Sequence, residues 1–192
     1  MGAIKPPEPI SVEAYLEGEL VSETKHEYVA GAIYAMAGAN NRHNAIAGNA
    51  LVSFANGLRG KPCRPFNSDT KVRIDLGDGV RFFYPDASVV CEGNADEESF
   101  QQKPVVIVEV LSPSTRRTDL GEKYQAYLAL PSLKVLLYVE PDLPAVTCHR
   151  RQPNGAFAQE IVEGLEASIA LPEIDTTLAL ADLYDRISFP TS

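Results

Sequence analysis

The sequence predicts a mixed α/β domain (α+β), with helices flanking one mixed sheet. Residues 105–111 (Val-Val-Ile-Val-Glu-Val-Leu) are apolar on both faces, which is typical of a central buried strand. Apolar residues return at helical spacing over residues 44–58 and 118–130, on either side of that strand in the sequence. Turn signals at residues 30–31 and 153–155 each separate two short strand patterns, so two hairpins extend the sheet.

The elements follow one another without an internal repeat. We expect a disordered lead-in over residues 1–10, where three prolines block regular pairing, and a single domain over residues 11–192. In the first half, the patterns predict a helix capped by Ser11, a hairpin over 26–34, a helix over 44–58, and strands over 72–76 and 81–92. An acidic loop over 92–104 follows, and then a strand over 105–111 and a helix over 118–130 capped by Thr118. The chain ends with a strand over 133–139, a hairpin of 145–150 and 157–162, and a short helix over 178–187.

Charge excludes one class of partner. Seventeen basic and 26 acidic residues give a net charge of −9, which argues against a non-specific coat on nucleic acid. Residues 59–73, with five basic side chains against one acidic, still leave a local basic face open.

Cysteines and apolar runs bear on the compartment. Cys63, Cys91 and Cys148 form no C-x-x-C pair, so the sequence favours neither a disulfide framework nor a zinc ribbon, and a reducing cytoplasm fits best. The amino terminus lacks the apolar stretch of a signal peptide, and no apolar run approaches a membrane span. We therefore expect a cytoplasmic protein with no membrane partner.

Glu109 is the sharpest local anomaly, because it is the only charged residue in an apolar run of seven. A buried glutamate needs a partner. Three interpretations stay open: the strand ends at Val108 and leaves Glu109 in water, Glu109 pairs with a structural cation, or it serves a functional site.

Three further acidic or basic residues belong to the segments before and after this strand. Asp86 follows Tyr84-Pro85 within a strand pattern, and Pro85 marks either a bulge that re-aims the aspartate or an ordinary turn. Lys123 borders the apolar stripe of the next helix, where it reaches the sheet edge or lies in solvent. Asp119, one turn earlier, either pairs with Lys123 or interacts with the helix dipole.

Together these side chains suggest phosphoryl chemistry. Asp86, Glu109 and the Val110 backbone carbonyl are hard oxygen ligands, which suit Mg²⁺ or Mn²⁺ rather than zinc. A lysine beside such a metal can orient water and stabilise charge on a phosphate.

The same residues resemble a known family. Pro85-Asp86, the run from Val108 to Thr115 (Val-Glu-Val-Leu-Ser-Pro-Ser-Thr) and the run from Asp119 to Lys123 (Asp-Leu-Gly-Glu-Lys) resemble the Uma-type restriction endonucleases of the PD-(D/E)XK nuclease superfamily. The resemblance extends over residues 11–187. It implies a restriction endonuclease-like core with flanking helices and added hairpins.

The resemblance also implies roles. Asp86 and Glu109 match the metal-binding acids, and Lys123 replaces the lysine that the superfamily motif places at position 111, which is leucine here. Glu27 matches an early acidic position that often joins the family's site, and His43 stands where the family often has a histidine. Alternatively, Glu27 is only a surface charge on the hairpin, and His43 is only a polar residue at the start of the helix. The family's Glu-Tyr-Trp on the following strand is absent from residues 134–139.

The leading hypothesis is a hydrolase that cleaves DNA with Mg²⁺ or Mn²⁺, for which a homodimer would suit the cutting of two strands. Because fold does not establish activity, a catalytically silent interaction module that keeps the nuclease fold is the alternative. A zinc or thiol enzyme is a third hypothesis, although the cysteines and histidines show no ligand spacing.

Overall fold

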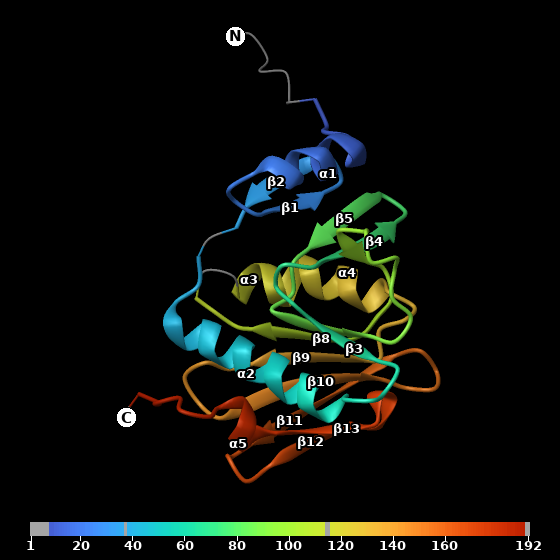
Figure 1. Cartoon of the computed structure of the whole chain (residues 1–192). Coiled ribbons are helices and arrows are strands. Elements are labelled where there is room, and N and C mark those ends of the chain that lie inside the picture. The colour runs from blue at the N-terminus through green and yellow to red at the C-terminus, as the bar shows by residue number, and fades with distance from the viewer. Residues whose placement is uncertain (1–7, 37, 114–115, 191–192) are drawn as a thin grey trace.

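The computed structural model describes residues 8–36, 38–113 and 116–190, and Figure 1 shows their arrangement. The described residues form a mixed α+β fold with two main sheets and one smaller sheet, rather than the single sheet expected from the element order. Most of the predicted lead-in, residues 1–7, lies outside the described residues; Ile10 donates its backbone N–H to the Gly31 carbonyl.

The first sheet has the strand order β2-β1-β5-β4-β7. Its strands are β1 (His26–Val29), β2 (Ala32–Ala35), β4 (Lys71–Leu76), β5 (Gly79–Phe83) and β7 (Phe100–Gln101). The predicted hairpin of β1 and β2 is confirmed, and it turns at Ala30 and Gly31, both of which have positive φ. Helix α1 (Val12–Val21) covers one face, and the Ser11 hydroxyl caps it by accepting from Ala14 N–H.

The second sheet has the order β11-β10-β9-β8-β6-β3. Its strands are β3 (Arg64–Asn67), β6 (Ala87–Val90), β8 (Pro104–Val110), β9 (Val135–Val139), β10 (Ala145–Arg151) and β11 (Phe157–Glu163). β8 is central, as its apolar sequence predicts, and pairs in parallel with β9 and antiparallel with β6. The predicted hairpin of β10 and β11 is also confirmed.

Two core layers cover the faces of this second sheet. Helix α2 (Asn41–Gly57) packs on one face through Ile46 and Phe54, together with β12 (Ser168–Leu171), β13 (Thr176–Ala179), a 3₁₀ turn (Pro172–Ile174) and α5 (Leu180–Leu183). Helix α4 (Tyr124–Ala129) packs on the other face, between the two sheets (Figure 1). The predicted terminal helix is therefore shorter than expected, because Leu178 and Ala179 belong to β13.

Pro85 marks the crossing between the sheets. The predicted strand over 81–92 is two strands, β5 in the first sheet and β6 in the second, and residues 84–86 connect them. Proline cannot donate to a ladder, which suits a residue between two sheets. The crossing leaves Asp86 immediately before β6, beside the central strand.

The predicted helix over 118–130 is divided into three parts. A short turn α3 (Arg116–Thr118) leads into a π-helical turn η1 (Asp119–Lys123) and then α4. Thr118 has helical dihedral angles and makes no side-chain cap, so the prediction that it caps the helix is wrong. Because π turns widen the helix, η1 changes where Asp119 and Lys123 point.

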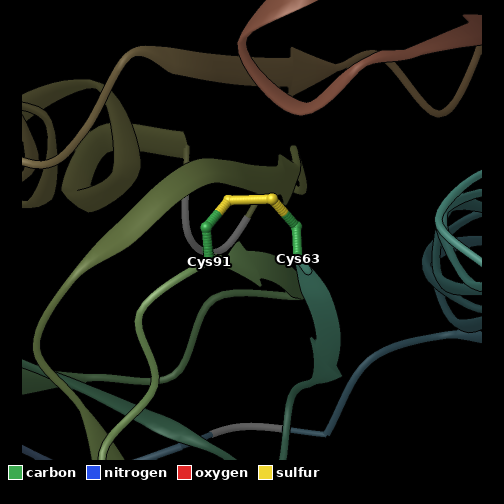
Figure 2. The surroundings of a disulfide bond; sticks show 2 residues. All are labelled: Cys63 and Cys91. Carbon is green, nitrogen blue, oxygen red and sulfur yellow. A yellow bond between two sulfur atoms is a disulfide. The ribbon is translucent and has the colours of Figure 1, made fainter. Parts of the chain in front are cut away.

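The prediction that the cysteines form no disulfide is also wrong. Cys63 and Cys91 are joined by a disulfide bond, shown in Figure 2, and Cys148 is free and buried. Cys63 precedes β3 and Cys91 follows β6, so the bond extends the antiparallel register of these strands by one pair beyond Arg64 and Val90. Sequence spacing could not reveal this, because strand pairing brings the two cysteines together.

No helix among the described residues is long and apolar enough to cross a membrane.

Candidate active site

A cleft of about 600 Å³ opens where the two sheets meet. β8 supplies its deepest wall, η1 and the start of α2 supply its sides, and the connection before β6 enters it. Its lining includes most of the residues that the sequence singled out: His43, Asp86, Glu109, Val110, Asp119 and Lys123. The fold thus collects groups that are up to 80 positions apart in the chain.

Glu109 lies within β8 and is 4% exposed, so the interpretation that the strand ends before it is wrong. Its side chain lies on the face of β8 toward α4, where Tyr127 donates its hydroxyl to Oε1 at 2.7 Å. Burial raises the pKa of Glu109 well above its usual value; Lys123 lowers it, and the charges of Asp86 and Asp119 raise it further. Burial thus disfavours the ionised carboxylate more than Lys123 and Tyr127 favour it.

Lys123 is buried rather than solvated, and three carboxylates surround its ammonium group. The Nζ atom lies 2.7 Å from Glu27 Oε1, 3.4 Å from Asp119 Oδ1 and 3.6 Å from Glu109 Oε1. Burial alone would lower the pKa of Lys123, but the charges of Glu109, Glu27 and Asp119 outweigh it and raise the pKa above its ordinary value. Lys123 consequently keeps its proton and can act as a cation and donor, not as a base.

Asp119 and Lys123 are the first and last residues of the π turn η1. The predicted pairing of Asp119 with Lys123 is present, and Asp119 is only 2% exposed. Tyr138, the β9 residue that pairs with Glu109, donates its hydroxyl to the Asp119 carbonyl at 2.6 Å. A wide turn with free carbonyls needs such external donors, so Tyr138 helps to hold η1 against the sheet.

Asp86 and His43 form the second part of the site. Asp86 Oδ2 accepts the Val110 backbone N–H at 2.7 Å, and His43 Nε2 lies 3.2 Å from the same oxygen. Burial lowers the pKa of His43, but a hydrogen bond and the charge of Asp86, with the Val110 backbone, raise it above its ordinary value overall. The start of α2 is therefore attached to the strand end that carries Glu109.

The donor set fits a divalent cation that keeps several water ligands. In the described part of the chain, the ion pairs of four carboxylates, those of Glu27, Asp86, Glu109 and Asp119, are with Lys123 and His43, and Lys25 also lines the cleft. Asp119 Oδ1 is buried and accepts no hydrogen bond from the described residues. Among residues 8–36, 38–113 and 116–190, no three His, Cys, Asp or Glu side chains are arranged to hold a metal by themselves. A cation would thus need backbone, water or substrate oxygens, as Mg²⁺ commonly does.

Sequence reasoning missed two tyrosines of this site. Tyr127 is part of the predicted apolar stripe of residues 118–130, and Tyr138 belongs to the strand after it. The signal was present, because a tyrosine hydroxyl in a fully apolar environment needs a partner. Sequence alone could not say that the partners are Glu109 and the Asp119 carbonyl.

Most basic side chains of residues 59–73 are paired or buried. Lys61, Arg64 and Arg73 make ion pairs with Asp175, Asp96 and Asp75, Lys71 is buried, and Arg59 is exposed. Acidic side chains thus balance most of the local excess of positive charge that the sequence indicates.

Comparison with known proteins gives a consistent result. A family model described as "Uma2: Putative restriction endonuclease" matches residues 12–181. The uncharacterized protein slr1290 of Synechocystis is 33% identical over 184 residues, which cover 94% of each chain. A second Synechocystis protein, sll1609, is 28% identical over 134 residues, which cover 68% of this chain and 75% of that protein.

A solved structure shares the fold. The crystal structure of a "putative nuclease belonging to DUF820" from Anabaena variabilis superposes with a TM-score of 0.72. The match covers 94% of this chain and all of that chain, at 20% sequence identity. The described fold is therefore the restriction endonuclease-like core.

Proposed function

Because the chain belongs to the Uma2 restriction endonuclease family, we propose that it is a divalent-metal-dependent endonuclease that hydrolyses phosphodiester bonds in DNA. The family supports a nuclease-type hydrolase; the metal and the DNA substrate are our inference. One observation carries the proposal: the buried carboxylate of Glu109, the ammonium of Lys123 and the carboxylate of Asp86 line one cleft at the end of β8.

Asp86, Glu109 and the Val110 carbonyl would hold Mg²⁺ or Mn²⁺. A bound divalent ion supplies Lewis-acid stabilisation and lowers the pKa of a coordinated water. In the hydrolysis, the water oxygen would bond to phosphorus as the bond to the leaving sugar oxygen breaks, and the proton lost by the water would pass through solvent to that leaving oxygen. Because the site holds more carboxylates than cations, its negative charge would attract a divalent cation and would repel a phosphate that came without one.

Lys123 would orient the attacking water and stabilise the negative charge that develops on the phosphate. Its raised pKa suits this role, because the group stays protonated. Glu27 of β1 and Asp119 of η1 both contact the ammonium group and would fix its position. His43 would hold Asp86 in place through the 3.2 Å contact.

We also propose a homodimer with DNA as its substrate, because two sites related by a two-fold axis suit the cutting of two strands. A cytoplasmic location is part of this proposal because of the DNA substrate, and the disulfide between Cys63 and Cys91 removes the argument from unpaired cysteines. The single-domain organisation over residues 11–192 belongs to the same proposal.

The test is cleavage of supercoiled plasmid and of single-stranded DNA with Mg²⁺, Mn²⁺ or EDTA. Glu109→Gln keeps the shape of the side chain and removes its charge, so we expect metal-dependent cleavage to fall roughly a hundredfold or more. Glu173→Gln is the matched control, since Glu173 is a half-buried carboxylate that accepts from Arg150 away from the cleft. This control should cleave like the wild type.

Equal cleavage by Glu109→Gln and wild type would refute the assignment of Glu109. A wild type that neither cleaves DNA nor binds Mn²⁺ would instead favour the interaction module, which the net charge of −9 makes the second candidate.

A further inference from the structure

Tyr127 is buried against the site without lining the cleft. It lies in α4 with 0% exposure, and its ring packs edge-to-face on Phe83 with centroids 5.8 Å apart. Its hydroxyl donates to Glu109 Oε1 at 2.7 Å. The ring therefore belongs to the core, and the hydroxyl alone connects that core to the site.

The two carboxylate oxygens of Glu109 differ in their contacts. In the described part of the chain, both the hydroxyl of Tyr127 and the ammonium of Lys123 approach Oε1. A carboxylate held at one oxygen cannot rotate freely, so its second oxygen keeps one direction. Since Oε1 already has two partners, Oε2 is the oxygen left for a cation in the cleft that Glu109 lines.

We propose that Tyr127 is a positioning residue that holds Oε1 of Glu109, so that Oε2 is preset as a metal ligand. This inference rests on the proposed function and goes beyond it, because it assigns a role to a residue outside the cleft. Partners of metal-binding carboxylates orient their ligands, and their loss commonly weakens metal affinity. Tyr127 does this from a rigid helix packed between two sheets.

Packing alone does not explain the hydroxyl. A phenylalanine would fill the same space against Phe83 and would bury no polar atom. The tyrosine is therefore favourable only because its hydroxyl has an acceptor, and that acceptor is the buried carboxylate.

Tyr184 offers a matched control. It is 3% exposed, it does not line the cleft, and its hydroxyl lies within hydrogen-bond distance of the carbonyls of Glu140 and Ala145. Tyr184→Phe thus removes buried hydrogen bonds of a purely structural kind. Any effect on metal binding that Tyr127→Phe shows and Tyr184→Phe lacks is specific to the site.

The experiment is calorimetric titration of Mn²⁺ into full-length wild type, Tyr127→Phe and Tyr184→Phe, without DNA. Melting curves recorded beside it establish that each variant is folded. We expect the dissociation constant to rise about tenfold in Tyr127→Phe and to stay unchanged in Tyr184→Phe. Cleavage by Tyr127→Phe should return to within about threefold of wild type at saturating Mn²⁺, and the melting curves with the Tyr184→Phe control separate this from the rescue of a stability defect by bound metal.

Equal affinity of wild type and Tyr127→Phe would overturn the inference and leave the proposed function standing. Equal weakening in both tyrosine variants would overturn it as well, by showing a general effect of stability. A folded wild type that binds no Mn²⁺ would overturn the proposed function and this inference together.

Discussion

Replacing Lys123 by methionine tests whether the site is held together by charge. Methionine has a similar length and suits the position beside the Phe83 ring, over which the ammonium lies at 5.7 Å. The substitution removes the one cation that Glu27, Glu109 and Asp119 share. The side chains of these three acids are 13%, 5% and 3% exposed, so water from the cleft replaces the lost partner only in part.

The expected cost follows from this burial. Removing one partner of a buried ion pair destabilises a protein by about 3–5 kcal/mol, because an uncompensated charge remains inside. In a chain of 192 residues each kcal/mol changes the melting temperature by roughly 2–4 °C. We therefore expect metal-free Lys123→Met to melt about 6–20 °C below the wild type.

The measurement is thermal unfolding followed by circular dichroism in EDTA and then in Mn²⁺. Lys103→Met is the control, because Lys103 pairs with Glu92 on the surface, where an ion pair contributes about 1 kcal/mol at most. We expect Mn²⁺ to return part of the lost stability to Lys123→Met, since a cation in the site offsets the carboxylates. A melting temperature equal to that of the Lys103→Met control would refute the reasoning.

Two further predictions concern stability. Because the pKa of His43 is raised in the folded protein, its contact with Asp86 stabilises the fold fully below about pH 6.5, and this stabilisation is lost as the pH rises through the higher folded pKa. His43→Gln should therefore lower the melting temperature more at pH 5.5 than at pH 9. A difference in melting temperature that does not depend on pH would contradict this. The disulfide between Cys63 and Cys91 closes a separation of 28 residues, which corresponds to about 3.5 kcal/mol. Reductant should therefore lower the urea midpoint of the wild type and leave a double serine variant unchanged, and an insensitive wild type would show that the bond contributes little.

Local patterns predicted much of the fold. The apolar run of β8 identified the central strand, because burial on both faces leaves no room for alternation. The hairpins of β1–β2 and β10–β11 were predictable from their turn residues alone. The division into two sheets was not, since Pro85 interrupts a strand pattern without revealing which strands the two halves will join.

The site was less predictable than the fold for the same reason. Glu109 was identifiable, because a charge in an apolar strand costs free energy wherever the strand lies. Its partners come from η1 and α4, and Lys123 pairs in turn with Glu27 of β1; no local pattern connects those elements to one another. Periodicity treated residues 118–130 as one helix, whereas Gly121 lies within a π turn that an α-helical wheel cannot represent.

The charge balance of the cleft links these observations. A single buried glutamate could be neutralised by Lys123 alone, and the site would then need nothing more. Glu27 and Asp119 instead compete for the same ammonium, at 2.7 and 3.4 Å against 3.6 Å for Glu109. Glu109 thus shares its ammonium with two other acids, and its burial in the cleft wall raises its pKa in spite of Lys123. This excess of buried carboxylates destabilises the fold locally, and a cation that entered from the cleft would offset their negative charge.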